Sequence, residues 1–230
     1  MAESNQESYH VVPFCPAPVR IIKPNKHFLF VAKPAGLLTI PGRREENKDC
    51  LITRLQSHHK SKTATVVHRL DMATSGIMVV ALSKMAHREI SRQFEHRETQ
   101  KHYIAMVDGI VEKDEGVIDL PMIADWPNRP KQKIDFEQGK KAVTEWKVLE
   151  RDHENQRTRL KLIPITGRSH QLRLHCFELG HPILGCNLYH KNGSEKKASR
   201  LLLHAESLTI KHPKTGEPVT ASAPCTFLLD

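Results

Sequence analysis

The sequence has no long apolar run and few aromatic residues. Hydrophobic residues make up 39% of the 230 residues, aromatic residues only 5%, and no stretch reaches the roughly 20 apolar residues that a membrane-spanning helix needs. Residues 1–9 are polar and acidic, unlike the basic and then apolar start of a secretory signal. We therefore expect a globular protein that makes no membrane contact and stays in the cytoplasm.

Paired cysteines are also absent. The five cysteines are scattered and contain no CxxC pair; they are Cys15, Cys50, Cys176, Cys186 and Cys225. This pattern favours free thiols in a reducing compartment over a disulfide framework. A zinc site among the His and Cys of 170–186 ranks below a structural role, because structural zinc ligands come in close pairs. The sequence has no P-loop and no GxGxxG motif either, so we expect neither a metal nor a cofactor.

Positive charge is what the chain has in excess. Thirty-five Lys and Arg stand against 26 Asp and Glu, which gives a net charge of +9 and a pI near 9.4. Such a balance predicts an anionic partner, above all a nucleic acid. A solvated Lys-rich surface would give the same total, so the distribution of the charge is more informative than its sum.

One proline-rich loop combines an aromatic residue with cations. Residues 125–133 contain Trp126, Arg129, Lys131 and Lys133. This arrangement suits single-stranded RNA, whose bases stack on aromatic rings while cations contact the phosphates. The alternative is an ordered surface loop with a buried Trp.

Short strand-like segments alternate with a few helical patterns. The expected helices cover 51–58, 84–97 and 169–179, and the expected strands cover 19–22, 28–32, 63–67, 77–82, 101–107, 117–120, 142–149 and 157–163. This mixture predicts an α+β domain built on an antiparallel or mixed sheet. Residues 1–17 are typical of a weakly ordered tail, so we expect one domain over 18–230.

A carboxylate lies between two of these strands, in the segment HRLDMATSG at 68–76. Asp71 would stand at a strand end on a rigid scaffold, which is a common position for a catalytic group. The alternative is an Asp that caps a turn through its own backbone. For an isolated Asp before Thr-Ser-Gly, the second reading is the commoner one.

The segment 68–76 resembles the HRLDxxTSG signature of the RluA family of pseudouridine synthases. Further matches follow the family in order: KPAG at 33–36, Tyr103, GRSHQLRLH at 167–175, HPILG at 181–185 and RLLLHA at 200–205. The family usually continues HPIxG with Asp, whereas this chain has Cys186. The departure puts the geometry of that loop in question, but not the chemistry at Asp71.

The resemblance implies a fold and an activity. The family fold is a long, bent, mixed and mostly antiparallel sheet with a central catalytic cleft, and an S4 RNA-binding domain is not expected here. The activity is the isomerisation of uridine to pseudouridine in RNA without metal or cofactor. The chain is most similar to a dual-specificity member that modifies a tRNA anticodon stem-loop and a 23S rRNA hairpin. We expect a monomer with both RNA substrates.

The resemblance also implies residue roles. Asp71 would act at the ribose, either as a nucleophile at C1′ or as a base at C2′. Arg168 would clamp this carboxylate, Tyr103 would stack on the uracil, and Arg69 would fill the gap left by the flipped base. The other predicted RNA-binding residues are His68, Thr74, Ser75, Trp126, Arg129, Lys131, Lys133, His170 and Arg173. The alternative functions are the same chemistry on a single rRNA or tRNA site, a non-catalytic RNA-binding module, and a hydrolase with a carboxylate nucleophile.

Overall fold

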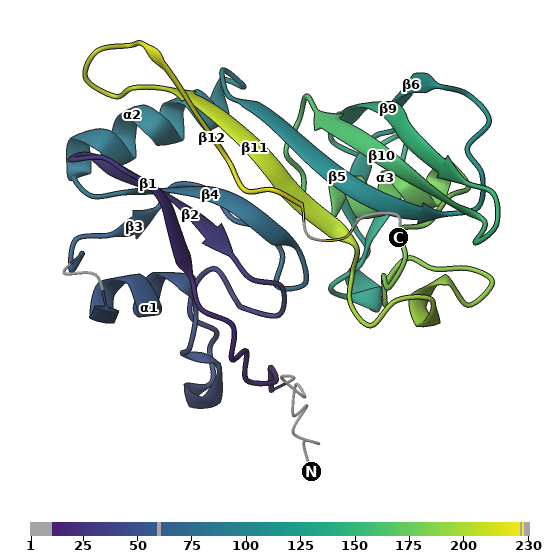
Figure 1. The fold of residues 1–230 in the computed structure, drawn as a ribbon, viewed down its shortest axis with the longest axis horizontal. Coiled ribbons are helices and arrows are strands. Elements are labelled where there is room, and N and C mark those ends of the chain that lie inside the picture. The colour runs from purple at the N-terminus through teal and green to yellow at the C-terminus, as the bar shows by residue number, and fades with distance from the viewer. Residues whose placement is uncertain (1–10, 59–60, 226, 228–230) are drawn as a thin grey trace.

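The computed structural model describes residues 11–58, 61–225 and 227 (Figure 1). The helices are α1 (Leu51–His58), α2 (Lys84–Glu95) and α3 (Gln171–Glu178), with short 3-10 turns at Glu45–Asn47, Trp126–Asn128 and Ser194–Lys196. The strands of the first half are β1 (Arg20–Pro24), β2 (Phe28–Lys33), β3 (Thr65–Val66), β4 (Ser75–Ala81), β5 (Gln100–Asp108) and β6 (Glu115–Asp119). The later strands are β7 (Met122–Ala124), β8 (Gln132–Ile134), β9 (Val143–Asp152), β10 (Arg157–Pro164), β11 (Leu203–Lys211) and β12 (Pro218–Ser222).

In this part of the chain, ten strands form one mixed sheet that runs across the whole molecule (Figure 1). The strand order is β1-β2-β4-β11-β5-β10-β9-β6, with β12 beside β11 and β3 beside β4. β4 and β11 are parallel, whereas the other paired strands are antiparallel. β7 and β8 form a separate hairpin. The expected α+β fold with a mixed, mostly antiparallel sheet is confirmed.

The buried residues form two hydrophobic clusters along this sheet. One cluster includes Phe30 of β2 and Leu55 of α1, and the other includes Leu160 of β10 and Leu174 of α3. Tyr103, on β5, packs against both clusters. The middle of the sheet, where β4, β11 and β5 are neighbours, is therefore the junction of two packed halves.

Local sequence signals set the ends of α1 and α2. α1 covers the predicted range. Ser83, the predicted N-cap of α2, accepts a hydrogen bond of 3.2 Å from the backbone N–H of Ala86. The helix ends before the expected Arg97, because that residue adopts a left-handed conformation with φ 60°. No helix among the described residues is long and apolar enough to cross a membrane.

The segment 11–17 packs onto the body, although we expected a weakly ordered tail over 1–17. Cys15 is only 7% exposed. The guanidinium of Arg54 donates hydrogen bonds to the carbonyl oxygens of Cys15, at 2.5 Å, and Ala17, at 2.7 Å. These contacts hold the part of the segment around Cys15, and the expected start of the domain at residue 18 stays a prediction. Residues 1–10 lie outside the described part of the chain.

Candidate active site

Asp71 lies in the turn between β3 and β4, and neighbouring groups hold its backbone in place. The N–H of Thr74 donates to the carbonyl oxygen of Asp71 at 3.1 Å, which closes the turn. The hydroxyl of Thr39 donates to the carbonyl oxygen of Leu70 at 2.8 Å. These contacts fix the main chain on both sides of the carboxylate, so Asp71 projects from a rigid support.

Lys33 ties a second turn to the Asp71 loop. The residue is 1% exposed, and its ammonium donates to three carbonyl oxygens, those of Pro34 at 2.9 Å, Leu37 at 2.8 Å and Met72 at 2.9 Å. The N–H of Gly36 donates to the same Met72 oxygen at 2.9 Å. Burial lowers the pKa of Lys33 to about 7, because a charge is costly in a dry interior. The KPAG segment therefore supports the loop that carries Asp71.

The Asp71 side chain opens onto a cleft of about 510 Å³ at the junction of the two halves. It is 22% exposed, so a ligand in the cleft can reach the carboxylate. The predicted site residues that line this cleft are Arg69, His68, Asp71, Thr74, Tyr103, Arg168, His170 and Arg173. Ser75 and the residues of the 125–133 segment do not line it.

The cation that faces Asp71 is Arg173 of α3. Its Nη1 atom lies 3.5 Å from Oδ2 of Asp71, and the side chain is only 4% exposed. The remaining donors are also in use: Nε and Nη2 each lie 3.5 Å from Sγ of Cys186, and Nη2 donates to Asn187 at 3.2 Å. A buried guanidinium held in this way is a fixed positive charge beside the carboxylate.

The predicted clamp by Arg168 is wrong as a description of this geometry. Arg168 precedes α3, and its Nε donates to the carbonyl oxygen of Lys141 at 3.2 Å. The reason is the turn at His170, where a left-handed φ of 56° starts the helix. This turn brings Arg173 to Asp71 and leaves Arg168 on the cleft wall in the preceding loop.

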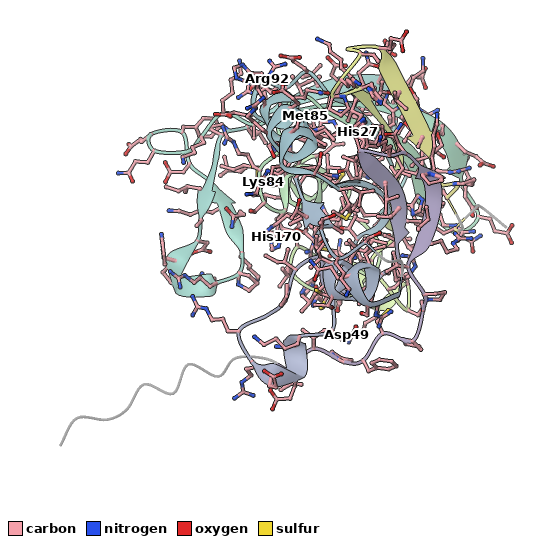
Figure 2. The ribbon with its side chains drawn as sticks, turned by 90° about the vertical axis from the view of Figure 1, so that its left-hand side faces the viewer. His27, Asp49, Lys84, Met85, Arg92 and His170 are labelled. Atoms are coloured by element: carbon pink, nitrogen blue, oxygen red, sulfur yellow. The ribbon has the colours of Figure 1, made fainter. Side chains whose placement is uncertain are left out.

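His170 is a polar neighbour of Asp71. Its Nε2 lies 3.9 Å from Oδ2 of Asp71, and its Nδ1 lies 2.9 Å from the hydroxyl of Tyr189. Burial lowers the pKa of His170, and the charge of Asp71 opposes this shift only in part. The ring is therefore neutral near pH 7. In Figure 2, His170 lies below α2, which carries the labelled Lys84, Met85 and Arg92.

Tyr103 lies on β5 in the middle of the sheet and lines the same cleft. Its backbone pairs with Leu162 of β10 on one side and Ala205 of β11 on the other. Burial raises the pKa of Tyr103 well above its usual range, and the nearby charge of Asp71 raises it further. The phenol is thus a neutral ring at physiological pH, suited to stack on a planar base.

The family model for RNA pseudouridylate synthase matches residues 27–178, two thirds of the chain and the part that contains Asp71, Tyr103 and Arg173. The chain belongs to this family. The dual-specificity RNA pseudouridine synthase RluA of Yersinia pestis is 55% identical over 199 residues, covering 86% of this chain and 95% of that protein. The same-named protein of Escherichia coli K12 is 53% identical over 207 residues, covering 90% and 93%. The chain is thus an RNA pseudouridine synthase, an isomerase.

Solved structures show the same fold. Human RNA Pseudouridylate Synthase Domain Containing 1 superposes with a TM-score of 0.78 at 29% identity, covering 94% of this chain and 87% of that one. Human RNA Pseudouridylate Synthase Domain Containing 4 gives a TM-score of 0.70 at 25% identity, with coverage of 90% and 88%. The synthase fold inferred from the motifs is therefore the fold of this chain.

Two residues that we expected to bind RNA serve the interior of the synthase instead. Nε2 of His68 accepts a hydrogen bond of 3.0 Å from the N–H of Val79, and the ring stacks on Phe94 at 4.3 Å. Burial lowers the pKa of His68 to about 3, so it is neutral. The Ser75 hydroxyl lies 2.8 Å from Nδ1 of His204 and is 7% exposed. The prediction for Ser75 is wrong, because β11 covers it. Thr74 is 3% exposed.

The 125–133 segment is the tip of the β7–β8 hairpin rather than a loop without strands. Trp126 is 66% exposed, which rules out the alternative of a buried Trp. The guanidinium carbon of Arg129 lies 3.4 Å from the centroid of the Trp126 ring. Lys133 lies on β8, 3.4 Å from a carboxylate oxygen of Asp135. An exposed ring with a stacked cation leaves the RNA-binding prediction for this segment open.

Two cations of the cleft, Arg97 and Lys101, lie outside the sequence motifs that predict the site. Both line it together with Asp71. A signal for Lys101 was available, because residues two apart on a strand face the same way and Lys101 is two residues before Tyr103. Arg97 had no such signal, since its place depends on the left-handed end of α2. Among the described residues, no group of three or more His, Cys, Asp or Glu could hold a metal ion.

Proposed function

We propose that Asp71 is the catalytic carboxylate of this synthase and that it acts on the ribose of a uridine flipped into the cleft. The observation that carries the proposal is the buried Arg173 guanidinium, 3.5 Å from an Asp71 side chain that is itself open to the cleft. A fixed cation beside a reachable carboxylate holds that carboxylate in one position at the cleft. A group that attacks or deprotonates the ribose needs such a fixed position.

The reaction exchanges one bond to C1′ for another. The bond from N1 of uracil to C1′ breaks, the base turns, and a bond from C5 to C1′ forms, while C5 loses a proton and N1 gains one. Asp71 serves either as a nucleophile at C1′ or as a base that removes the C2′ proton. Nothing is oxidised or hydrolysed, so the product is an isomer.

The other cleft residues bind and orient the base. Tyr103 is a neutral, half-buried ring at the centre of the cleft, and we assign it the stacking contact with uracil. Arg69 is exposed on the same cleft and would enter the space that the flipped base leaves. Flipping costs a few kcal/mol, and less in a loop than in a duplex.

Replacement of Asp71 by Asn tests the proposal. The substitution keeps the shape and removes the charge, so tritium release from RNA labelled at uridine C5 should fall below detection. RNA affinity should stay within about threefold, since binding rests on other contacts. Asp119→Asn is the matched control, because Asp119 is exposed on β6 and does not line the cleft. Turnover by Asp71→Asn within tenfold of the wild type would refute the assignment, and would favour a non-catalytic RNA-binding role for this carboxylate.

We further propose dual specificity, for a tRNA anticodon stem-loop and a 23S rRNA hairpin. The relatives are named dual-specificity synthases, and a cleft of about 510 Å³ is large enough for one flipped nucleotide. An enzyme that reads the local shape of a loop accepts any RNA that presents the same shape. An isolated anticodon stem-loop with a uridine at the start of its loop should therefore be a substrate.

Mapping of pseudouridines in cells that lack the protein tests dual specificity. Loss of modification in both tRNA and 23S rRNA is expected, and loss in only one RNA class would refute it. We place the enzyme in the cytoplasm, which its five free cysteines and its RNA substrates support, and we expect it to act as a monomer. Sedimentation of the free enzyme would show a larger species if the monomer assignment were wrong.

A further inference from the structure

A second part of the cleft wall brings together three cations from three elements. Arg97 follows α2, Lys101 lies on β5, and Arg168 lies in the loop between β10 and α3. All three line the same cleft as Asp71. We call these residues the cationic wall. Arg173 is separate from it, since that guanidinium is already engaged with Asp71.

Lys101 stands at the centre of the cationic wall. Its Nζ lies 6.0 Å from the centroid of the Phe94 ring on α2. A Cβ atom added at Gly167 would lie 3.8 Å from the same Nζ, so the ammonium is also next to the loop that carries Arg168. Burial lowers the pKa of Lys101, and the charge of Arg97 lowers it further. Like charges held close together in a partly dry site are stabilised by an anion between them.

The protein itself supplies little negative charge there. Neither Arg97 nor Lys101 forms an ion pair with a carboxylate of the described residues. The nearby Glu98 is used by Arg92, at 3.1 Å, and by Lys211, at 3.0 Å. Glu95 is the one carboxylate on this part of the described wall, and it opposes three cations. The cationic wall therefore keeps a net positive charge that faces the cleft.

The register of β5 relates the cationic wall to the uracil site. Lys101 and Tyr103 are two residues apart, so their side chains project from the same face of the strand, about 6.5–7 Å from each other along it. Tyr103 is the residue to which we assign the stacked uracil. An anion held at Lys101 would thus lie beside the nucleotide whose base is in the cleft.

We propose that Arg97 and Lys101, together with Arg168, bind a backbone phosphate of the RNA strand adjacent to the flipped uridine. Phosphate fits this arrangement because a guanidinium can bind two of its oxygens and an ammonium supplies a point charge. The proposal deepens the proposed function and rests on it, since the strand is placed by the uridine in the cleft. It assigns to the cationic wall the task of holding the strand while the base turns.

The experiment uses anticodon stem-loops in which one phosphate at a time is replaced by a neutral methylphosphonate. Wild-type enzyme should lose about tenfold in affinity at one phosphate next to the target uridine, because a charge-assisted contact is lost there. Lys101→Gln should bind the unmodified RNA more weakly, by up to about tenfold, and should lose less than the wild type at that phosphate, because only Arg97 and Arg168 remain to contact it. The slope of log affinity against log salt should fall by about one.

Two further variants control the measurement. Lys113→Gln removes an exposed cation outside the cleft and should match the wild type at every position. Lys101→Arg keeps the charge and should recover most of the affinity, which a folding defect would not allow. Lys101→Gln should also raise KM more than it lowers kcat, since Lys101 does not touch the reacting atoms.

The proposal is overturned if Lys101→Gln binds the unmodified RNA as the wild type does. It is also overturned if the losses from the variant and from the methylphosphonate add at every position, because the side chain would then contact none of those phosphates. These binding results stand apart from turnover. Asp71→Asn with full activity would sink the proposed function and leave the mapped phosphate contact in place.

Discussion

Nη1 of Arg173 lies 3.5 Å from Oδ2 of Asp71, and the same guanidinium contacts Sγ of Cys186 through Nε and Nη2. Arg173 is on α3 and Asp71 follows β3, so the pair joins the two halves of the molecule across the cleft. The position at which this chain departs from the family pattern, Cys186, is therefore one contact away from the carboxylate. The contacts of Cys186 thus extend beyond its own loop to the arginine that faces Asp71.

Arg173→Met should lower kcat at least about a hundredfold, the usual cost of removing a fixed charge-stabilising group from an active site. Arg168→Met should act mainly on RNA affinity, because Arg168 lies on the cationic wall. Single-turnover tritium release at saturating RNA, with each variant checked for folding by thermal unfolding, gives the comparison. If Arg168→Met lost more of its single-turnover rate than Arg173→Met, Arg168 would be the functional partner of Asp71.

Cys186→Ala should lower kcat about tenfold with little change in KM. The substitution leaves two N–H groups of the buried Arg173 without their acceptor, which costs about 1–3 kcal/mol and lets the guanidinium turn from Asp71. Cys186→Ser retains an acceptor and should recover most of the activity. Steady-state kinetics of the three proteins decide the question, and equal kcat values would show that the sulfur does not orient Arg173.

Tyr103 should not ionise in the range where the enzyme works. Its pKa is raised, so the phenol stays neutral up to and beyond pH 10. The basic limb of the pH–rate profile should thus have the same midpoint in the wild type and in Tyr103→Phe, whatever the difference in rate. A limb between pH 8 and 10 that disappears in the Phe variant would contradict the shift. Tyr103→Leu should weaken binding more than Tyr103→Phe, since only the latter keeps the ring.

Lys33 should make the stability of the fold depend on pH. Its pKa is about 7 in the folded protein against its ordinary value of 10.5, so the unfolded chain binds more protons between these values. The free energy of unfolding therefore gains a contribution as pH rises from about 7 to 10, and below about 7 this contribution is constant. Lys33→Met removes this contribution, along with the donors to three carbonyl groups.

Urea unfolding of both proteins at several pH values measures the difference. The wild type should be the more stable protein throughout if its three hydrogen bonds outweigh the cost of burying the amine. The difference in the free energy of unfolding between the wild type and Lys33→Met should increase as pH rises from about 7. A gap that is independent of pH over this range would show that Lys33 keeps its ordinary pKa in the folded state. Thr39→Val, which loses one loop contact but no titrating group, is a suitable control.

Local patterns were sufficient for much of the fold. The range of α1 follows from the spacing of its apolar residues, and the start of α2 follows from Ser83 as its N-cap. Both signals depend only on residues that are close together in the sequence. The strand β3 is shorter than expected, with two residues in place of the segment 63–67. Pairing partners far along the chain decide how much of an apolar segment joins a sheet.

The parallel contact between β4 and β11 shows what a local reading misses. Ser75 and Gly76 have turn chemistry, yet they begin β4 opposite His204 and Ala205. A Cβ at Gly76 would overlap the carbonyl oxygen of Ala205, so only glycine allows the two strands to meet. This pairing buries the Ser75 hydroxyl, which the sequence predicts to bind RNA.

The sequence by itself determined the family, the catalytic carboxylate that we assign and the class of fold, because these depend on short motifs and on the periodicity of apolar residues. Only the tertiary structure decided which arginine faces Asp71. Arg168 and Arg173 belong to one motif and both line the cleft, but only Arg173, on the helix that starts at the left-handed turn of His170, faces Asp71. The tertiary structure also decided that Arg97, Lys101 and Arg168 line one wall of the cleft. These residues belong to three separate parts of the chain, which only the folded sheet brings together.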